Sequence, residues 1–147
     1  MAETQLADST GQERALRVLI GENNSDLAMT LRLLLDDEPD MLCVSTAGSV
    51  SAVLRAVEEH APNAFILDLS LDDGSSLSLI GVLRQRLPRS AIVVFTGHKN
   101  EWLDEQCLKA GANAVVVKTS DFEVLTAALR RAAAQGWTPP APQRPGG

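Results

Sequence analysis

The sequence predicts an α/β protein with a doubly wound parallel sheet and helices on both of its faces. Short apolar runs alternate five times with segments of helical periodicity, and the connections between them are short. The runs near 64–68, 91–95 and 114–117 are apolar throughout, as in parallel strands that are covered on both faces. A chain of 147 residues suits one domain with a core of its own.

The elements follow in order along the chain. The expected strands lie near residues 17–21, 42–46, 64–68, 91–95 and 114–117. The first expected helix begins at Asn24 or Ser25 and the second at Ser49, because such residues cap helices with their side-chain oxygens. Pro88 ends the third helix and Gly111 the fourth, and the fifth begins at Ser120-Asp121.

The two ends of the chain differ in composition from the part between them. Residues 1–15 mix polar residues without any period, and we expect a flexible N-terminal extension. Residues 137–147 are rich in Pro and Gly and predict a flexible tail. The domain is therefore expected to span residues 16–136.

Composition and charge exclude several classes of protein. The net charge of −6 argues against a nucleic-acid-binding surface, which needs clustered Lys and Arg. We expect no membrane span and no secretory signal, and therefore a cytoplasmic protein. Cys43 and Cys107 lack a CxxC partner or a histidine at ligand spacing, which predicts buried thiols in a reducing compartment.

Polar side chains follow four of the expected strands. Asp68 ends the run that begins at Phe65, and the strand near 17–21 leads into Glu22 and Asn23. The two later strands lead into Thr96 and Lys118. The carboxyl ends of parallel strands form the edge at which α/β sheets bind ligands, so we expect these side chains to meet there.

This order of residues resembles the receiver domain of two-component response regulators, over roughly residues 16–135. The segments that carry the resemblance are Arg17–Ile20, Leu67–Gly74, Val94–Gly97 and Ala110–Lys118. The resemblance implies a flavodoxin-like (βα)5 fold with the strand order 2-1-3-4-5. It also implies a signalling protein with no enzymatic activity beyond self-phosphorylation and autodephosphorylation. We expect a single-domain regulator, because the length leaves no room for a second domain.

The resemblance assigns a role to each candidate residue. Asp68 accepts a phosphoryl group from a phosphohistidine of a sensor histidine kinase or a phosphotransfer protein. The Thr96 hydroxyl and the Lys118 ammonium contact the phosphoryl oxygens. Mg²⁺ is held by Glu22, Asn23, Asp68 and the backbone carbonyl of Ser70. A downstream protein then reads the face formed by the fourth helix, the fifth strand and the fifth helix.

The sequence departs from the family pattern at functional positions. Asn23 stands where a second acid is usual and Glu22 is longer than the usual aspartate, so we expect weak Mg²⁺ binding. Asp72 stands where proline is common and adds negative charge near the site. Val115 replaces the usual aromatic switch residue, and Thr119 replaces the proline that commonly follows the lysine.

Three alternatives remain open. A pseudo-receiver would dock its partners without phosphorylation. An aspartyl-nucleophile phosphotransferase or phosphatase would need a second acid two residues after the first, where this chain has Ser70. A flavodoxin-like cofactor binder would need a Gly-rich or Ser/Thr-rich phosphate loop after the first strand, where this chain has acidic Gly21-Glu22-Asn23.

Overall fold

The computed structural model describes residues 16–71 and 73–140, and these residues form a single parallel sheet flanked by helices. Asp72, the expected N-terminal extension 1–15 and residues 141–147 of the expected tail 137–147 lie outside the described residues. The strands are β1 Leu16–Gly21, β2 Met41–Ala47, β3 Ala64–Leu67, β4 Ala91–Thr96 and β5 Ala114–Val117. They pair in parallel in the order β2-β1-β3-β4-β5, which confirms the predicted fold and topology.

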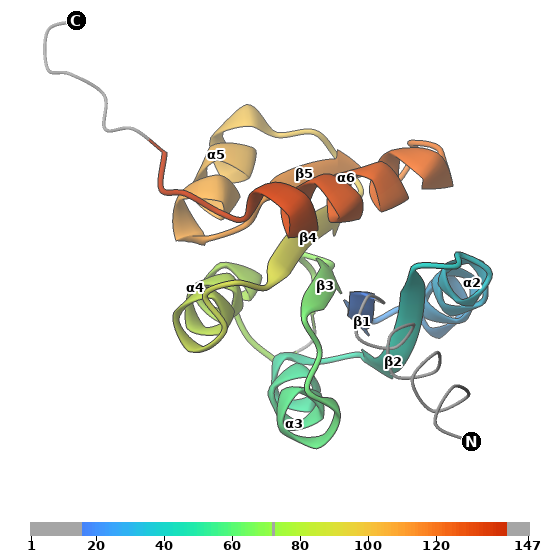
Figure 1. The fold of residues 1–147 in the computed structure, drawn as a ribbon. Helices are drawn as coiled ribbons and strands as arrows, with labels where there is room; N and C mark the ends of the chain where they lie inside the picture. The colour runs from blue at the N-terminus through green and yellow to red at the C-terminus, as the bar shows by residue number, and fades with distance from the viewer. Residues whose placement is uncertain (1–15, 72, 141–147) are drawn as a thin grey trace, which may run out of the picture.

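In the described part of the chain, five helices cover both faces of the sheet, four of them connecting successive strands and the fifth following β5. They are α2 Ser25–Asp36, α3 Val50–His60, α4 Ser76–Arg86, α5 Glu101–Ala110 and α6 Phe122–Gln135. Helices α2 and α6 lie on one face, and α3, α4 and α5 lie on the other (Figure 1). None of the helices in the described part of the chain is long and apolar enough to cross a membrane.

Side chains of the central strands alternate between two cores. Ile66 and Val93 pack under α2 and α6, whereas Phe65, Leu67 and Val94 pack under the other three helices. Both sets are buried, because successive side chains of a strand point to opposite faces and both faces are covered. This burial explains why the runs near 64 and 91 are apolar without interruption.

The helix starts are fixed by side-chain caps. Asn24 accepts a hydrogen bond from Leu27 N at 3.0 Å, and Ser49 accepts one from Ala52 N at 3.1 Å. These caps satisfy backbone N–H groups that have no partner inside the helix. Asp121 stands at the cap position of α6 without such a side-chain bond.

The chain stays packed beyond the expected end of the domain. Trp137, which we expected to open a flexible tail, donates from Nε1 to the Leu108 carbonyl at 3.2 Å and lies over the Arg84 guanidinium at 5.3 Å. An indole pairs a large apolar ring with one N–H donor, so it can pack and hydrogen-bond together. Packing therefore continues at least one residue past the boundary at 136.

Candidate functional site

Backbone pairing brings the predicted residues to one edge of the sheet. Asp68 N donates to the Gly21 carbonyl at 2.8 Å, which places Asp68 beside the residue after β1. Lys118 N donates to the Thr96 carbonyl at 2.6 Å in the same way. The parallel ladder thus continues for one residue past the strands and aligns the polar residues that follow them.

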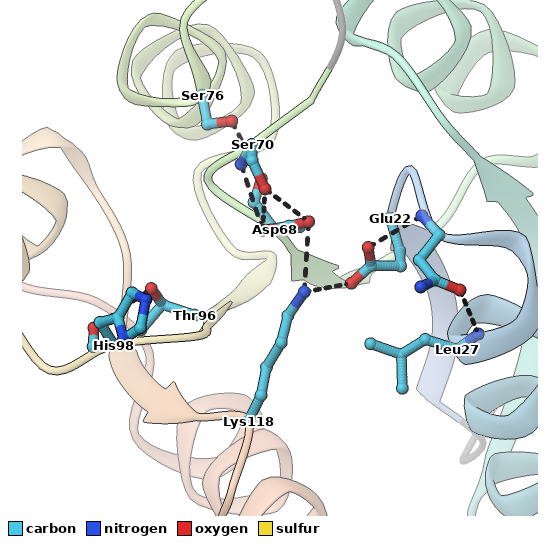
Figure 2. Close-up of polar contacts among 9 residues, drawn as sticks. Glu22, Leu27, Asp68, Ser70, Ser76, Thr96, His98 and Lys118 are labelled. Carbon is cyan, nitrogen blue, oxygen red and sulfur yellow. Dashed lines mark hydrogen bonds and ion pairs between the residues drawn. The ribbon is translucent and has the colours of Figure 1, made fainter.

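The Lys118 ammonium lies between two buried carboxylates. Its Nζ is 2.7 Å from Glu22 Oε1 and 3.3 Å from Asp68 Oδ2 (Figure 2). The carboxylate residues are only 4% and 3% exposed, so this ion pair is largely removed from water. Lys118 meets Asp68 at the expected edge of the sheet, but its shorter contact is with Glu22.

Two serines fix Asp68. The Ser70 hydroxyl donates to Asp68 Oδ1 at 2.9 Å or to Oδ2 at 3.0 Å, and Ser70 N donates to Oδ1 at 3.1 Å. The buried Ser76 hydroxyl, at the start of α4, donates to the backbone carbonyl of Asp68 at 2.9 Å. The nucleophile candidate is therefore held by both its side chain and its backbone.

The other predicted residues lie at the same edge with different contacts. The Thr96 hydroxyl donates to the His98 carbonyl at 3.3 Å and points away from the ammonium (Figure 2). Asn23 is exposed and lines, with Glu22, a hollow of about 510 Å³ beside α2. The structure thus brings Glu22, Asp68 and Lys118 into contact, with Thr96 and Asn23 around them.

The pKa values of the Glu22 and Asp68 carboxyl groups are shifted in opposite directions. Burial raises the pKa of Glu22, and the bonds from Lys118 and from Asn24 N offset only part of this effect. Burial also raises the pKa of Asp68, but hydrogen bonding to Glu22 and Ser70, with the charge of Lys118, outweighs burial and lowers this pKa. The pKa of Lys118 is raised, because the contacts with both acids outweigh its burial. Asp68 is therefore the acid that holds its negative charge more strongly.

The donor atoms suit a hard cation. The carboxylates of Glu22 and Asp68, the amide oxygen of Asn23 and the carbonyl of Ser70 are all oxygen ligands, which Mg²⁺ prefers. Among the described residues, no three His, Cys, Asp or Glu side chains gather in an arrangement that could hold a metal ion. The site thus fits Mg²⁺ in donor type, with Lys118 between the carboxylates.

A further acid joins the loop after β3 to helix α3. Asp73 accepts hydrogen bonds from Val50 N at 2.5 Å, from Ser51 N at 3.3 Å and from the Ser51 hydroxyl. These bonds satisfy N–H groups in the first turn of α3 and lower the pKa of Asp73, the Ser51 hydroxyl having the largest effect. Asp73 therefore ties the loop after β3 to the first turn of α3.

Sequence reasoning missed several contacts of this site. It assigned Ser70 a backbone role only, and it did not consider Ser76 or a direct bond between Glu22 and Lys118. The only signal available was the position of Ser75-Ser76 at the start of a helix after the acidic loop. That signal indicates a cap but not a bond back to Asp68.

Comparison with known proteins identifies the family. The family model of the response regulator receiver domain matches residues 18–130. The photosynthetic apparatus regulatory protein RegA of Rhodobacter capsulatus is 33% identical over 146 residues, which are 99% of this chain and 75% of RegA. The transcriptional regulatory protein KdpE of Mycobacterium tuberculosis is 35% identical over 116 residues, covering 71% of this chain.

Solved structures agree with this match at the level of the fold. A two-component response regulator of the LuxR family from Aurantimonas sp. SI85-9A1 superposes with a TM-score of 0.77 at 23% identity, covering 87% of this chain and 91% of that one. The chain spans only 51% of the length of KdpE, so the match concerns the receiver part of that relative. On the extent of the family match and the identity to RegA, this chain belongs to the response regulator receiver domain family.

Proposed function

We propose that Asp68 accepts a phosphoryl group from the phosphohistidine of a sensor histidine kinase or a phosphotransfer protein. The observation that carries this proposal is the buried Asp68 carboxylate at the carboxyl edge of the sheet, 3.3 Å from the Lys118 ammonium. Phosphoryl transfer depends mainly on positioning and on the neutralisation of charge, and both are provided around this carboxylate.

The chemical step is a transfer between two nucleophiles. An Asp68 carboxylate oxygen attacks the phosphorus atom, the bond from phosphorus to the donor histidine nitrogen breaks, and an acyl phosphate forms. The hydrogen bonds from Ser70 orient the carboxylate, and Lys118 is placed to contact the phosphoryl oxygens. Mg²⁺, when held by Glu22, Asn23, Asp68 and the Ser70 carbonyl, supplies further neutralisation of the phosphoryl charge.

The signal then passes to a partner protein by contact. By resemblance to the family, we propose that this contact is made on the face formed by α5, β5 and α6. Trp102 on α5 is 66% exposed, and large aromatic side chains often anchor protein interfaces. The Thr96 hydroxyl lies at the end of β4, close in sequence to the start of α5 at Glu101, so a contact with the phosphoryl group could be passed to this face.

Intact mass spectrometry tests the proposal. Wild-type protein incubated with acetyl phosphate and Mg²⁺ should gain one phosphoryl group, and Asp68→Asn should gain none. Asp73→Asn is a matched control, because it alters an acid of the same loop while asparagine can still cap α3. Modification that persists in Asp68→Asn would refute the assignment of Asp68.

A second candidate function is a docking module that works without phosphorylation. It is favoured by the presence of two carboxylates, rather than three, at the expected metal site. In that case wild-type protein would gain no phosphoryl group from either acetyl phosphate or a phosphorylated donor protein. The same mass measurement therefore separates the two candidates.

A further inference from the structure

We propose that the hollow at the C-terminal ends of α3 and α4 is a docking site for an acidic segment of a partner protein, whose carboxylates pair with arginines there. The two helices lie on the same face of the sheet (Figure 1), and the hollow has a volume of about 330 Å³. Asn63, which lines it, precedes β3, whereas Asp68 follows β3. The hollow is therefore at the opposite end of the sheet from Asp68, and the inference goes beyond the proposed phosphoryl transfer and does not depend on it.

The walls of the hollow are apolar and are held in place before any ligand arrives. Pro62, Leu87 and Pro88 supply the apolar part of the lining, and a proline ring fixes its own backbone φ. The Ser90 hydroxyl donates to the Leu87 carbonyl at 2.8 Å. Arg84 Nη1 donates to the Pro88 carbonyl at 2.9 Å and to the Ser90 carbonyl at 2.8 Å. Because the turn after α4 is fixed in this way, little freedom is lost when a ligand binds.

Two unpaired arginines lie at the hollow. Arg86 and Arg89 line it, both are exposed, and neither has an ion pair or a side-chain hydrogen bond with any residue in the described part of the chain. Arg86 also lines a second hollow of about 420 Å³, together with Arg55. The acids Glu58 and Glu59 line this second hollow, and no acid is among the described residues that line the first. The acidic residue of a ligand is therefore expected in the first hollow.

A structural role explains only part of this positive charge. Arg86 is in the last turn of α4, where a cation is favoured by the partial negative charge of the helix end. Arg89 lies beyond the helix, and no such role accounts for it. Two like charges at one hollow repel each other, so a ligand that brings carboxylates to both is favoured by charge complementarity.

The charge around the hollow favours a carboxylate over a phosphate. A guanidinium binds either group through paired N–H bonds. However, α3 ends at His60 and α4 ends at Arg86, so the C-terminal ends of two helices lie beside the hollow. The partial negative charge of these ends opposes a phosphate dianion more than it opposes a single carboxylate. Since the walls are apolar, the expected segment combines acidic residues with apolar ones.

An extended chain fits the region better than a small molecule does. Small-molecule pockets bury most of their ligand, whereas most residues that line this hollow are exposed. The Asn63 side-chain oxygen accepts a hydrogen bond from Arg17 N at 2.7 Å, and its Nδ2 has no acceptor among the described residues. This Nδ2 can donate to a backbone carbonyl of a bound chain. The second hollow shares Arg86 with the first and gives room for that chain to continue.

An NMR titration of the whole chain tests the proposal. The probe is a short peptide of alternating Asp and Leu with blocked ends, and the control peptide has Asn in place of Asp. We expect the Asp peptide to shift the backbone amides of Asn63, Leu87 and Ser90, and to bind at least about fivefold more tightly than the Asn peptide. Equal binding of the two peptides, or no shift of these amides, would overturn the proposal.

Substitution of the arginines separates a local site from a general effect of charge. Arg86→Gln/Arg89→Gln should weaken binding of the Asp peptide at least about tenfold, because both side chains pair with its carboxylates. Arg32→Gln/Arg131→Gln removes the same charge from α2 and α6 and should weaken binding less than about twofold. All four arginines are exposed, so both variants should fold as the wild type does. Similar losses in the two double variants would contradict a local site.

A small carboxylate distinguishes the proposed occupant from a free metabolite. These titrations use no phosphodonor, so their outcome is separate from that of the mass measurement on Asp68. Hexanoate added to the wild-type chain should shift the same amides only at concentrations far above those of the Asp peptide, because it has one carboxylate and no backbone to bond Asn63. If hexanoate acts at the lower concentration, the hollow is a small-molecule site and docking of a protein segment is wrong.

Discussion

The sheet has a basic side chain packed at each of its two ends, and the two are satisfied in different ways. Lys118 lies at the carboxyl ends of the strands between two carboxylates. Arg84 lies near the amino ends of β4 and β5, is 7% exposed, and is bonded to neutral oxygens. The acceptors of Arg84 are the carbonyls of Gly111, Pro88 and Ser90 and the side chain of Asn113.

Because of this difference, we assign a structural role to Arg84 and a functional role to Lys118. The planar guanidinium of Arg84 joins α4 to the loops before β4 and β5, and Trp137 covers it. A Cβ added at Gly111 would lie 2.6 Å from the Cβ of Arg84, so the fit around this arginine is close. Lys118 carries a point charge at the end of a flexible stem, and we propose that it contacts the phosphoryl oxygens once Asp68 is modified.

Replacement of Arg84 should have the largest effect on stability. Arg84→Met leaves several buried carbonyls without a donor, and we expect the free energy of unfolding to fall by about 3 kcal/mol. Urea denaturation measures this change. Arg86→Met, an exposed position of the same helix, should change it by less than about 0.5 kcal/mol. If the free energy of unfolding changes little in Arg84→Met, Arg84 matters no more for stability than Lys118 does.

Replacement of Lys118 should change stability less and signalling more. In Lys118→Met the two carboxylates keep the donors Ser70 N and Asn24 N, so we expect a change of about 1 kcal/mol in the free energy of unfolding. The NMR shift differences between the phosphorylated and free states should be lost. If those differences remain intact in Lys118→Met, the role of Lys118 is structural and the contrast with Arg84 disappears.

A third carboxylate should strengthen metal binding at the Lys118 end of the sheet. Asn23→Asp adds an anionic oxygen ligand, and we expect about fivefold tighter Mg²⁺ binding in an NMR titration. Asn24→Asp is the matched control, because it adds the same charge one residue further on and can still cap α2. If Mg²⁺ affinity rises equally in both variants, the added negative charge near the site is responsible, and the side chain at position 23 does not bind the metal.

Replacement of a third and more exposed cation, Arg130, should have the smallest effect on the free energy of unfolding. Arg130 Nε lies 2.8 Å from Asp40 Oδ2, and hydrogen bonding from Arg130 lowers the pKa of Asp40 below its usual 3.8 despite some burial. The pair therefore stabilises the fold above about pH 4, and this contribution is lost as the pH falls through the lowered pKa. Both side chains are 42% exposed, so we expect only a few tenths of a kcal/mol.

Urea denaturation of wild type and Arg130→Gln at about pH 6 and about pH 2 checks this expectation. The difference between the two proteins should shrink at the lower pH. A difference that is independent of pH would show that Arg130 acts by packing rather than by its charge.

Much of the fold could be predicted because its signals are local. The strand at 114–117 has the predicted bounds, and β4 runs one residue further than predicted because Thr96 still pairs with Val117. Trp137 was missed because a Pro-rich sequence indicates a tail and gives no sign of a ring that packs on a distant arginine. The cap of α2, in contrast, needs only its own helix, and Asn24 is one of the two capping residues that the sequence predicted.

The sequence alone determined the alternation of strands and helices, the parallel sheet and the placement of Asp68, Thr96 and Lys118 at the carboxyl ends of their strands. These features depend on the period of apolar residues and on neighbours within a few positions. Only the tertiary structure decided that Lys118 bonds Glu22 across two intervening strands, that Ser76 holds the Asp68 backbone, and that Arg84 ends among carbonyls. Such contacts depend on strand order and on the reach of long side chains, which no local pattern records.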